Sequence, residues 1–264
     1  MRRLLSRLVV VLAAVGLVHL APVPMAWSAP ATRAAIVRDA GRGAQTPFPS
    51  SHFGVRWTGD EEAVVEVRSH NEDGWGPWQQ VEADHDMSEG TGGVVFGALV
   101  VADAADRVQT RVVSGEARDV VVDAFDTRHG PRKLVRATRE AAGSSASASM
   151  ADTRVGQPGV ITRAQWGADE SMRKAGPSFA PISRLVVHHT ATPNGDPDPA
   201  ATVRAVYAYH VQSRGWNDIG YNFLVDEQGR IYEGRWSRTY AAGETPTGED
   251  AGGRGVIGAH AEGG

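Results

Sequence analysis

The sequence contains no cysteine among its 264 residues. Disulfide bonds, cysteine-ligated zinc fingers, iron–sulfur clusters and thiol nucleophiles are therefore excluded from this stretch of chain. Any metal bound by these residues would be held by histidine and carboxylate side chains. Positive charge is also scarce, since 27 Lys and Arg stand against 31 Asp and Glu, a formal net charge of −4. An acidic chain is a poor candidate for nonspecific binding to nucleic acid or to anionic membranes.

Long hydrophobic runs are absent after the first thirty residues. The apolar stretch at residues 8–20 follows a basic start with Arg2, Arg3 and Arg7 and precedes small residues at 29–31. This order is typical of a secretory signal peptide, which we place at residues 1–31. The alternative is a membrane anchor, but the run is short for ~30 Å of hydrocarbon. The sequence therefore predicts a secreted protein, extracellular or associated with the cell wall, without stable membrane insertion after signal removal.

Residues 48–127 contain short segments of alternating or continuous apolar residues separated by turns. About six such segments predict an all-β, sandwich-like domain. Trp75 and Trp78 lie in one of its turns, where they form either a sugar-stacking platform or a pair that packs a hairpin end against the core. Residues 128–157 then change to a Gly-, Ser- and Ala-rich composition, which predicts a flexible linker.

Residues 158–264 combine strand and helix patterns. A strand is expected at 184–189, and a helix at 199–214, with Asp198 as N-cap, Pro199 in its first turn and Gly215 as its stop. Two further strands, 221–225 and 230–233, are joined by a turn at 226–229. Strand, helix and hairpin in this order predict an α/β domain.

The strand at 184–189 ends in two adjacent histidines, His188 and His189. Adjacent strand residues point to opposite faces of a sheet, so the two side chains cannot easily bind one metal ion together. One of them is expected to face a cleft. The pair alone leaves two interpretations open: a metal ligand with a supporting neighbour, or one core and one surface histidine.

The surrounding residues carry a resemblance to a known family. Five segments carry it, in chain order ITRAQWGA (161–168), VHHTAT (187–192), RGWNDIGYNFLV (214–225), GRIYEGR (229–235) and GAH (258–260). His210 lies between the second and the third segment. Together they resemble the zinc-dependent N-acetylmuramoyl-L-alanine amidases and the peptidoglycan recognition proteins that share their domain. The resemblance covers about residues 158–264, and it implies the α/β amidase fold of that family.

The resemblance also implies site residues and a reaction. His188 matches the first zinc ligand, and Tyr221 matches a tyrosine that assists at the scissile carbonyl. Zn²⁺ would hold and activate a water molecule, which hydrolyses the amide between N-acetylmuramic acid and L-alanine. A phenol can donate a hydrogen bond to the oxyanion that develops in such a reaction. The partners implied are peptidoglycan and its muropeptides.

Further positions match residues on or near the substrate groove of some relatives: His210, Trp216, Arg235 and His260. Helix-end packing is the alternative for His210 and Trp216, and a solvated pair of Arg235 with Glu233 is the alternative for the hairpin. We expect Trp166 in the core and Asp218 as a turn cap beside Gly220.

The resemblance departs at the end of the sequence. In the family, a second zinc-binding histidine and a third ligand, Cys or Asp, lie well downstream, and no residue after His260 matches them. Glu244, Asp250 and His260 are possible substitutes, but the Gly-rich stretch at 251–255 offers little rigidity. We therefore expect a domain that is incomplete at its C-terminus, and a chain that, as given, is either inactive or a fragment of a longer amidase.

Two other functions compete with the amidase. A non-catalytic module that binds muropeptides would need no further zinc ligands. A secreted β-sandwich adhesin would leave the ordered segments unexplained. A serine hydrolase is disfavoured because no G-x-S-x-G segment occurs after the signal peptide.

Overall fold

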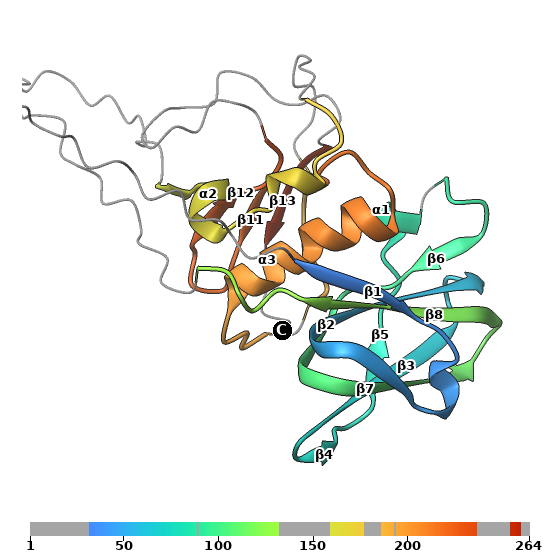
Figure 1. Cartoon of the computed structure of the whole chain (residues 1–264). Coiled ribbons are helices and arrows are strands. Elements are labelled where there is room, and N and C mark those ends of the chain that lie inside the picture. Colours follow the sequence, from blue (N-terminus) through green and yellow to red (C-terminus); the bar gives the residue numbers. More distant parts are fainter. Residues whose placement is uncertain are drawn as a thin grey trace, which may run out of the picture.

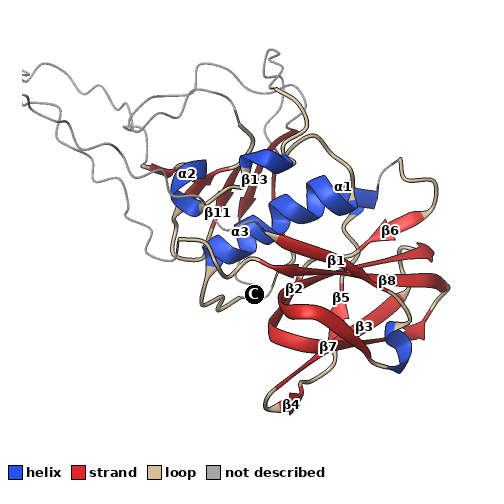
Figure 2. Ribbon diagram, in the orientation of Figure 1, coloured by secondary structure: helices blue, strands red, loops and turns tan. Residues whose placement is uncertain are grey.

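The computed structural model describes residues 32–88, 90–131, 159–176, 186–192, 194–236 and 254–259. The predicted signal peptide, most of the predicted linker and His260 lie outside the described residues. The described residues form two parts that pack side by side (Figures 1 and 2). We call residues 32–131 the β part and the described residues from 159 onward the mixed part.

The β part consists of strands that all belong to one antiparallel sheet, in the order β1-β8-β2-β7-β3-β4, with β5 added on β3 and β6 on β2. Short helices flank the strands. The elements are β1 (Arg33–Val37), η1 (Ala40–Arg42), β2 (Ala44–Gly59), β3 (Val64–Asn71), β4 (Gly74–Trp75), β5 (Gln79–Val81), α1 (His85–Ser88), β6 (Val94–Phe96), β7 (Val100–Ser114) and β8 (Ala117–Asp126).

Two features of the β part differ from the sequence prediction. The strands begin at Arg33, upstream of the predicted start at residue 48, because β1 pairs with the end of β8. The strands also form one continuous sheet, whereas a sandwich has two. The reason is the length of β2 and β7, whose pairing shifts register near Ser50, so that one sheet bends around its own core (Figure 1).

The core of the β part follows the alternation expected from the sequence. Phe53, Val55 and Trp57 on β2 are almost fully buried, as are Val65 and Val67 on β3. The residues between them point to the other face of the sheet, as the period of two requires.

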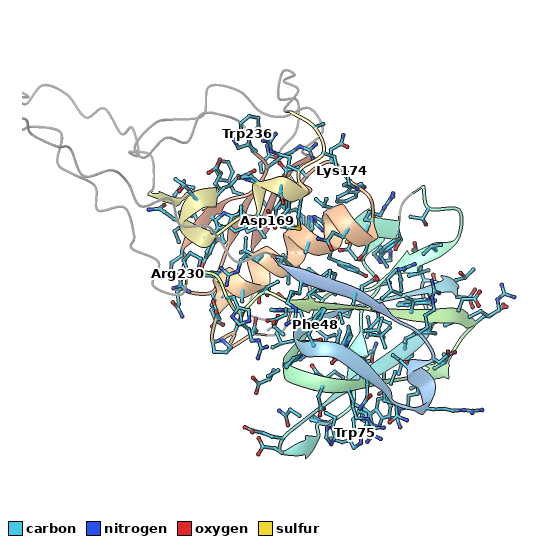
Figure 3. The ribbon with its side chains drawn as sticks, viewed as in Figure 1. Phe48, Trp75, Asp169, Lys174, Arg230 and Trp236 are labelled. Carbon is cyan, nitrogen blue, oxygen red and sulfur yellow. The ribbon has the colours of Figure 1, made fainter. Side chains whose placement is uncertain are left out.

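The turn that contains Trp75 and Trp78 lies at the far end of the β part (Figure 3 labels Trp75). The Arg68 guanidinium lies over both indole rings, 4.6 Å from each centroid, and Arg111 lies over Trp78 at 4.3 Å. Sugar stacking needs an open ring face, and guanidinium groups cover these faces. The structure therefore favours packing of the hairpin end over a sugar-binding platform.

The mixed part is an α/β unit, as its sequence pattern predicts. Its five-stranded sheet has the order β10-β13-β11-β12-β9, in which the β11–β12 pair is antiparallel and the other pairs are parallel. Its elements are β9 (Val160–Ile161), α2 (Arg163–Trp166), η2 (Glu170–Met172), β10 (Val186–His188), α3 (Pro199–Ala208), η3 (Tyr209–Ser213), β11 (Tyr221–Val225), β12 (Ile231–Glu233) and β13 (Arg254–Ala259). The predicted hairpin and its turn are confirmed.

Helix α3 begins and ends as predicted, except for its last turn. Asp198 caps it, since its Oδ1 accepts a hydrogen bond from the Ala201 amide at 3.1 Å, and Pro199 occupies the first turn. From Tyr209 the helix widens into the π-helical turn η3. It stops at Gly215, whose φ of 87° lies in the left-handed region that favours glycine.

Helix α3 lies between the sheet of the mixed part and the β part (Figure 1). The core around it is shared, because Met87, Phe96, Leu99 and Phe125 of the β part belong to the same cluster of buried residues as α3. Polar contacts cross the same boundary: Arg204 Nε donates to the Thr127 carbonyl at 2.8 Å. Among the described residues, no helix is both long enough and apolar enough to cross a membrane.

Candidate functional site

Three of the predicted site residues meet at one place in the mixed part. His188 ends β10, Tyr221 begins β11, and His210 lies on η3. The ring of Tyr221 contacts both histidines, with centroids 5.5 Å from His188 and 5.2 Å from His210. Residues that are 33 positions apart in the sequence therefore form one aromatic cluster, which we call the His–Tyr cluster (His188, His210 and Tyr221).

His188 is half-buried, and its neighbour His189 is exposed, in agreement with opposite orientations on the strand. The Nδ1 of His188 lies 2.7 Å from the His189 carbonyl oxygen. A carbonyl only accepts hydrogen bonds, so Nδ1 carries the proton of the neutral ring. The lone pair is then on Nε2, and this is the tautomer that binds a metal through Nε2.

His210 is buried and has the opposite tautomer. Its Nδ1 accepts a hydrogen bond from the Gly220 amide at 3.0 Å, which places the ring proton on Nε2. Burial, together with the nearby charges of Arg235 and His188, lowers the pKa of His210 to about 3. At neutral pH this side chain is an uncharged hydrogen-bond donor in a dry environment.

Trp216 and Arg235 border the His–Tyr cluster. The Trp216 ring packs edge-on against His210, at 4.8 Å between centroids, and it covers Gly220 so closely that a Cβ there would lie 2.5 Å from Trp216 Cζ3. The Arg235 amide donates to the Tyr221 carbonyl at 2.7 Å. Four of the residues that the resemblance assigns to the groove or to the scissile carbonyl are thus neighbours, while His260 is not among the described residues.

A buried ion pair supports this region, and the sequence alone did not indicate it. Arg163 Nη1 lies 3.1 Å from Asp218 Oδ1, and both side chains are 3% exposed. Arg163 also binds Glu170 at 2.7 Å. Asp218 does act as the predicted turn cap, since it accepts from the Ile219 amide at 2.7 Å. The charged residues Arg163 and Asp218 are visible in two separate segments of the sequence, but nothing in the sequence indicates that they form a pair.

Glu233 does not belong to a solvated hairpin pair, so that alternative is wrong for this residue. It is buried, and its Oε2 accepts from the Arg163 amide at 2.9 Å. Burial raises the pKa of Glu233 to about 7. Trp166 is fully buried, as predicted, and its Nε1 donates to the Glu233 carbonyl at 2.8 Å.

The described residues do not make a three-ligand zinc site. No group of three His, Cys, Asp or Glu among them could hold a metal ion. His188 has a suitable tautomer, but His210 uses its Nδ1 lone pair on the Gly220 amide. The proposed substitutes Glu244, Asp250 and His260 lie outside the described residues. The described residues therefore provide one suitable imidazole, whereas a catalytic zinc site needs three protein ligands.

Comparison with known proteins finds a matching family for a region of the mixed part. Residues 178–263 match the family model described as N-acetylmuramoyl-L-alanine amidase. The resemblance inferred from the ordered segments is therefore confirmed for this region.

Particular relatives extend the comparison. Peptidoglycan-recognition protein LE of Drosophila melanogaster is 40% identical over 85 residues, which cover 31% of this chain and 25% of that protein. The N-acetylmuramoyl-L-alanine amidase of Homo sapiens is 31% identical over 112 residues, which cover 40% of this chain and 19% of that protein. The chain thus matches well under half the length of these relatives.

One similar solved structure is peptidoglycan recognition protein-LE in complex with tracheal cytotoxin, a monomeric diaminopimelic acid-type peptidoglycan. It is 33% identical and covers 38% of this chain and 57% of that chain. The TM-score of 0.29 is too low to compare the two folds.

Proposed function

We propose that this protein acts on bacterial peptidoglycan as an N-acetylmuramoyl-L-alanine amidase. The observation that carries the proposal is the contact of Tyr221 with both His188 and His210, inside the region that matches the amidase family model. The names of the relatives support the same substrate, since one is an amidase and the other a peptidoglycan-recognition protein.

Each residue of the site has a role in this proposal. Neutral His210 donates a hydrogen bond to the bound muropeptide, and Trp216 and Arg235 border the groove in which it lies. Tyr221 donates its phenolic proton in a hydrogen bond to the carbonyl oxygen of the amide that is cleaved, where negative charge develops. The His188 ring lies edge-on to the Tyr221 ring, with centroids 5.5 Å apart. Zinc is implied by the family resemblance alone. Because the described residues include one candidate ligand, none of the roles above is assigned to zinc.

The route to the substrate is also part of the proposal. Residues 1–31 act as a secretory signal peptide, so that the mature protein reaches the cell wall or the medium. Such a location agrees with a substrate that lies outside the cytoplasmic membrane.

The second candidate is a module that binds muropeptides without cutting them. The specific observation in its favour is the lack of a three-ligand metal group among the described residues. Binding needs only the groove residues His210, Trp216 and Arg235, whereas hydrolysis needs an activated water as well.

The two candidates differ in one assay. The purified chain is incubated with insoluble peptidoglycan, with added Zn²⁺ and with a chelator, and both the pelleted protein and the free amino groups of L-alanine are measured. The amidase predicts new L-alanine amino termini that disappear in His188→Ala and fall ~10²-fold in Tyr221→Phe, the usual cost of one oxyanion donor. Tyr232→Phe is the matched control, because Tyr232 lies on the adjacent strand with its hydroxyl on Asp226.

The outcomes separate the proposals. Pelleting without amino-group release, unchanged by the chelator, would establish the binding module and overturn the amidase. Release that is unaffected in both His188→Ala and Tyr221→Phe would remove the His–Tyr cluster from the reaction. A chain that neither pellets nor releases peptide would overturn both functions.

A further inference from the structure

The β part contacts the candidate site through one side chain next to His210. In the π-helical turn η3, Tyr209 points into the β part while His210 joins the His–Tyr cluster. Tyr209 is 2% exposed, and its ring lies between Phe96 and Phe125, 5.9 Å from each centroid. Its hydroxyl donates to the Val55 carbonyl at 3.3 Å. The anchor and the site residue are thus consecutive in the chain.

Gly54 on β2 completes the pocket that holds Tyr209. A Cβ at this position would lie 2.4 Å from Tyr209 Cε2, well inside van der Waals contact. The ring therefore lies directly on the backbone of the central strand of the β part, where only glycine leaves room for it. A strand of a separate sheet thereby fixes the position of the residue that precedes His210.

The π-helical turn explains why this anchor matters. A π turn is a rare, wide turn, and it persists where its surroundings hold it. Here the turn is held on both sides: Arg214 Nε donates to the Met87 carbonyl of α1 at 2.7 Å, and Lys174 Nζ donates to the Val211 carbonyl at 2.8 Å. The Arg214 amide closes the wide turn on the Tyr209 carbonyl at 3.0 Å.

The wide turn sets the two hydrogen bonds that orient His210. The His210 carbonyl accepts from the Trp216 amide at 3.0 Å, and the His210 Nδ1 accepts from the Gly220 amide at 3.0 Å. If Tyr209 moved, the turn would relax, and the ring of His210 and the indole of Trp216 would move with it.

We propose that the β part is a positioning element of the site, which acts through Tyr209, seated on Gly54, to hold the π-helical turn and thereby the orientation of His210 and Trp216. Tyr209 is a positioning residue, since it touches the site only through its neighbour. The role in substrate binding rests on the proposed function, whereas the orientation of His210 does not.

The test uses the full chain and two readouts. The first is the ¹⁵N chemical shift of the His210 ring, which reports whether Nδ1 still accepts the Gly220 hydrogen bond, and which needs no ligand. The second is the dissociation constant of a soluble muramyl peptide, followed by Trp fluorescence. Gly54→Ala forces the Tyr209 ring away, and Tyr209→Phe removes only the hydrogen bond to Val55.

Val65→Ala is the matched control. Val65 is fully buried on β3 and belongs to the separate core cluster of the β part, so its truncation loosens the same part of the molecule without touching Tyr209. We expect Gly54→Ala to shift the His210 ¹⁵N resonances and to weaken muramyl-peptide binding about tenfold, Tyr209→Phe about threefold, and Val65→Ala not at all.

Unchanged His210 resonances in folded Gly54→Ala would overturn the proposal. If Gly54→Ala does not fold, Tyr209→Phe decides in the same way, and wild-type values in both of its readouts would overturn it. Equal ¹⁵N shifts of His210 in Val65→Ala would show that a general loss of stability causes the change, and would also overturn the proposal. If the wild-type chain binds no muramyl peptide, the binding function fails, while the ¹⁵N shifts still decide whether the β part positions His210.

Discussion

The β part and the mixed part differ in where their cores come from. The cluster that contains Phe53, Val65 and Val108 is built entirely from the β part. The cluster around α3, in contrast, takes Phe96 and Phe125 from the β part. The dependence is therefore unequal: the β part has a hydrophobic cluster of its own and shares a second one, whereas the described residues of the mixed part cluster only with the help of β-part side chains.

Truncation of Phe125 is the strongest test of this unequal dependence. Phe125→Ala leaves a cavity in the shared core and should cost about 3–5 kcal/mol of unfolding free energy. Amide hydrogen exchange should accelerate in both parts, because the side chain stands on β8 and packs on Tyr209. Leu224→Ala, in the same cluster but on β11, should accelerate exchange in the mixed part only. Equal acceleration in the β part by both variants would contradict the comparison.

Acid should weaken the boundary between the parts. His52 Nε2 of the β part lies 2.9 Å from Thr202 Oγ1 of α3, within hydrogen-bond distance. Burial lowers the pKa of His52 to about 4. Below pH ~6.5 His52 is protonated in the unfolded chain but stays neutral in the folded chain. The free energy of unfolding therefore falls as the pH drops from about 6.5 to 4. The loss should reach ~3 kcal/mol, at 1.36 kcal/mol per pKa unit.

His52→Gln removes this titration and keeps a polar group that can reach Thr202. Denaturant unfolding of both chains at several pH values between 4 and 7 measures the effect. The difference in stability between wild type and variant should change across this window, and a constant difference would contradict the assignment to His52.

The mixed part should show the opposite pH dependence through Glu233. Burial raises the pKa of Glu233 to about 7, above its unfolded value near 4.5. Between these values the folded chain holds a proton that the unfolded chain has released, so stability falls as the pH rises from about 4.5 to 7 and is constant beyond. We expect a loss of ~3 kcal/mol, at 1.36 kcal/mol per pKa unit. In Glu233→Gln the loss should vanish, and unfolding curves with the slope of wild type would show that another group titrates.

The smallest expected effect concerns the start of α3. Asp198→Ala removes the cap of the Ala201 amide and should cost about 1 kcal/mol. Asp198→Asn serves as the control, because an asparagine side chain caps nearly as well. Thermal unfolding measures both variants, and an equal loss in both would point to the charge of Asp198 instead of its hydrogen bond.

Local signals in the sequence predicted local structure well. Asp198, Pro199 and Gly215 marked the limits of the helix, and alternation marked the strands β2, β3 and β11. Residues 33–37 gave no alternating pattern, and their strand exists because β8 offers an edge to pair with. Neither helix propensity nor hydrophobic period contains information about a π turn, so the widening at Tyr209 was not predictable.

The residues of the candidate site could be predicted from their types and their order in the sequence. The contacts that hold these residues in place could not. The resemblance selected His188, His210, Trp216, Tyr221 and Arg235, and the fold brings them together. The ion pair of Arg163 with Asp218 joins positions 55 residues apart. In the sequence Gly54 looks like any glycine in a strand, and only the structure shows that the Tyr209 ring packs on it. Such contacts depend on tertiary packing, which single-sequence patterns do not encode.

The place of β13 in the sheet has a consequence for the order of folding. This strand lies between β10, which ends at His188, and β11, which begins at Tyr221, and pairs in parallel with both. The two strands can therefore be aligned only when residues 254–259 have paired with both of them. Parallel pairing across so many residues is slow. The alignment of His188 with Tyr221 is therefore expected to form more slowly than the β11–β12 hairpin, whose paired residues are close in the sequence.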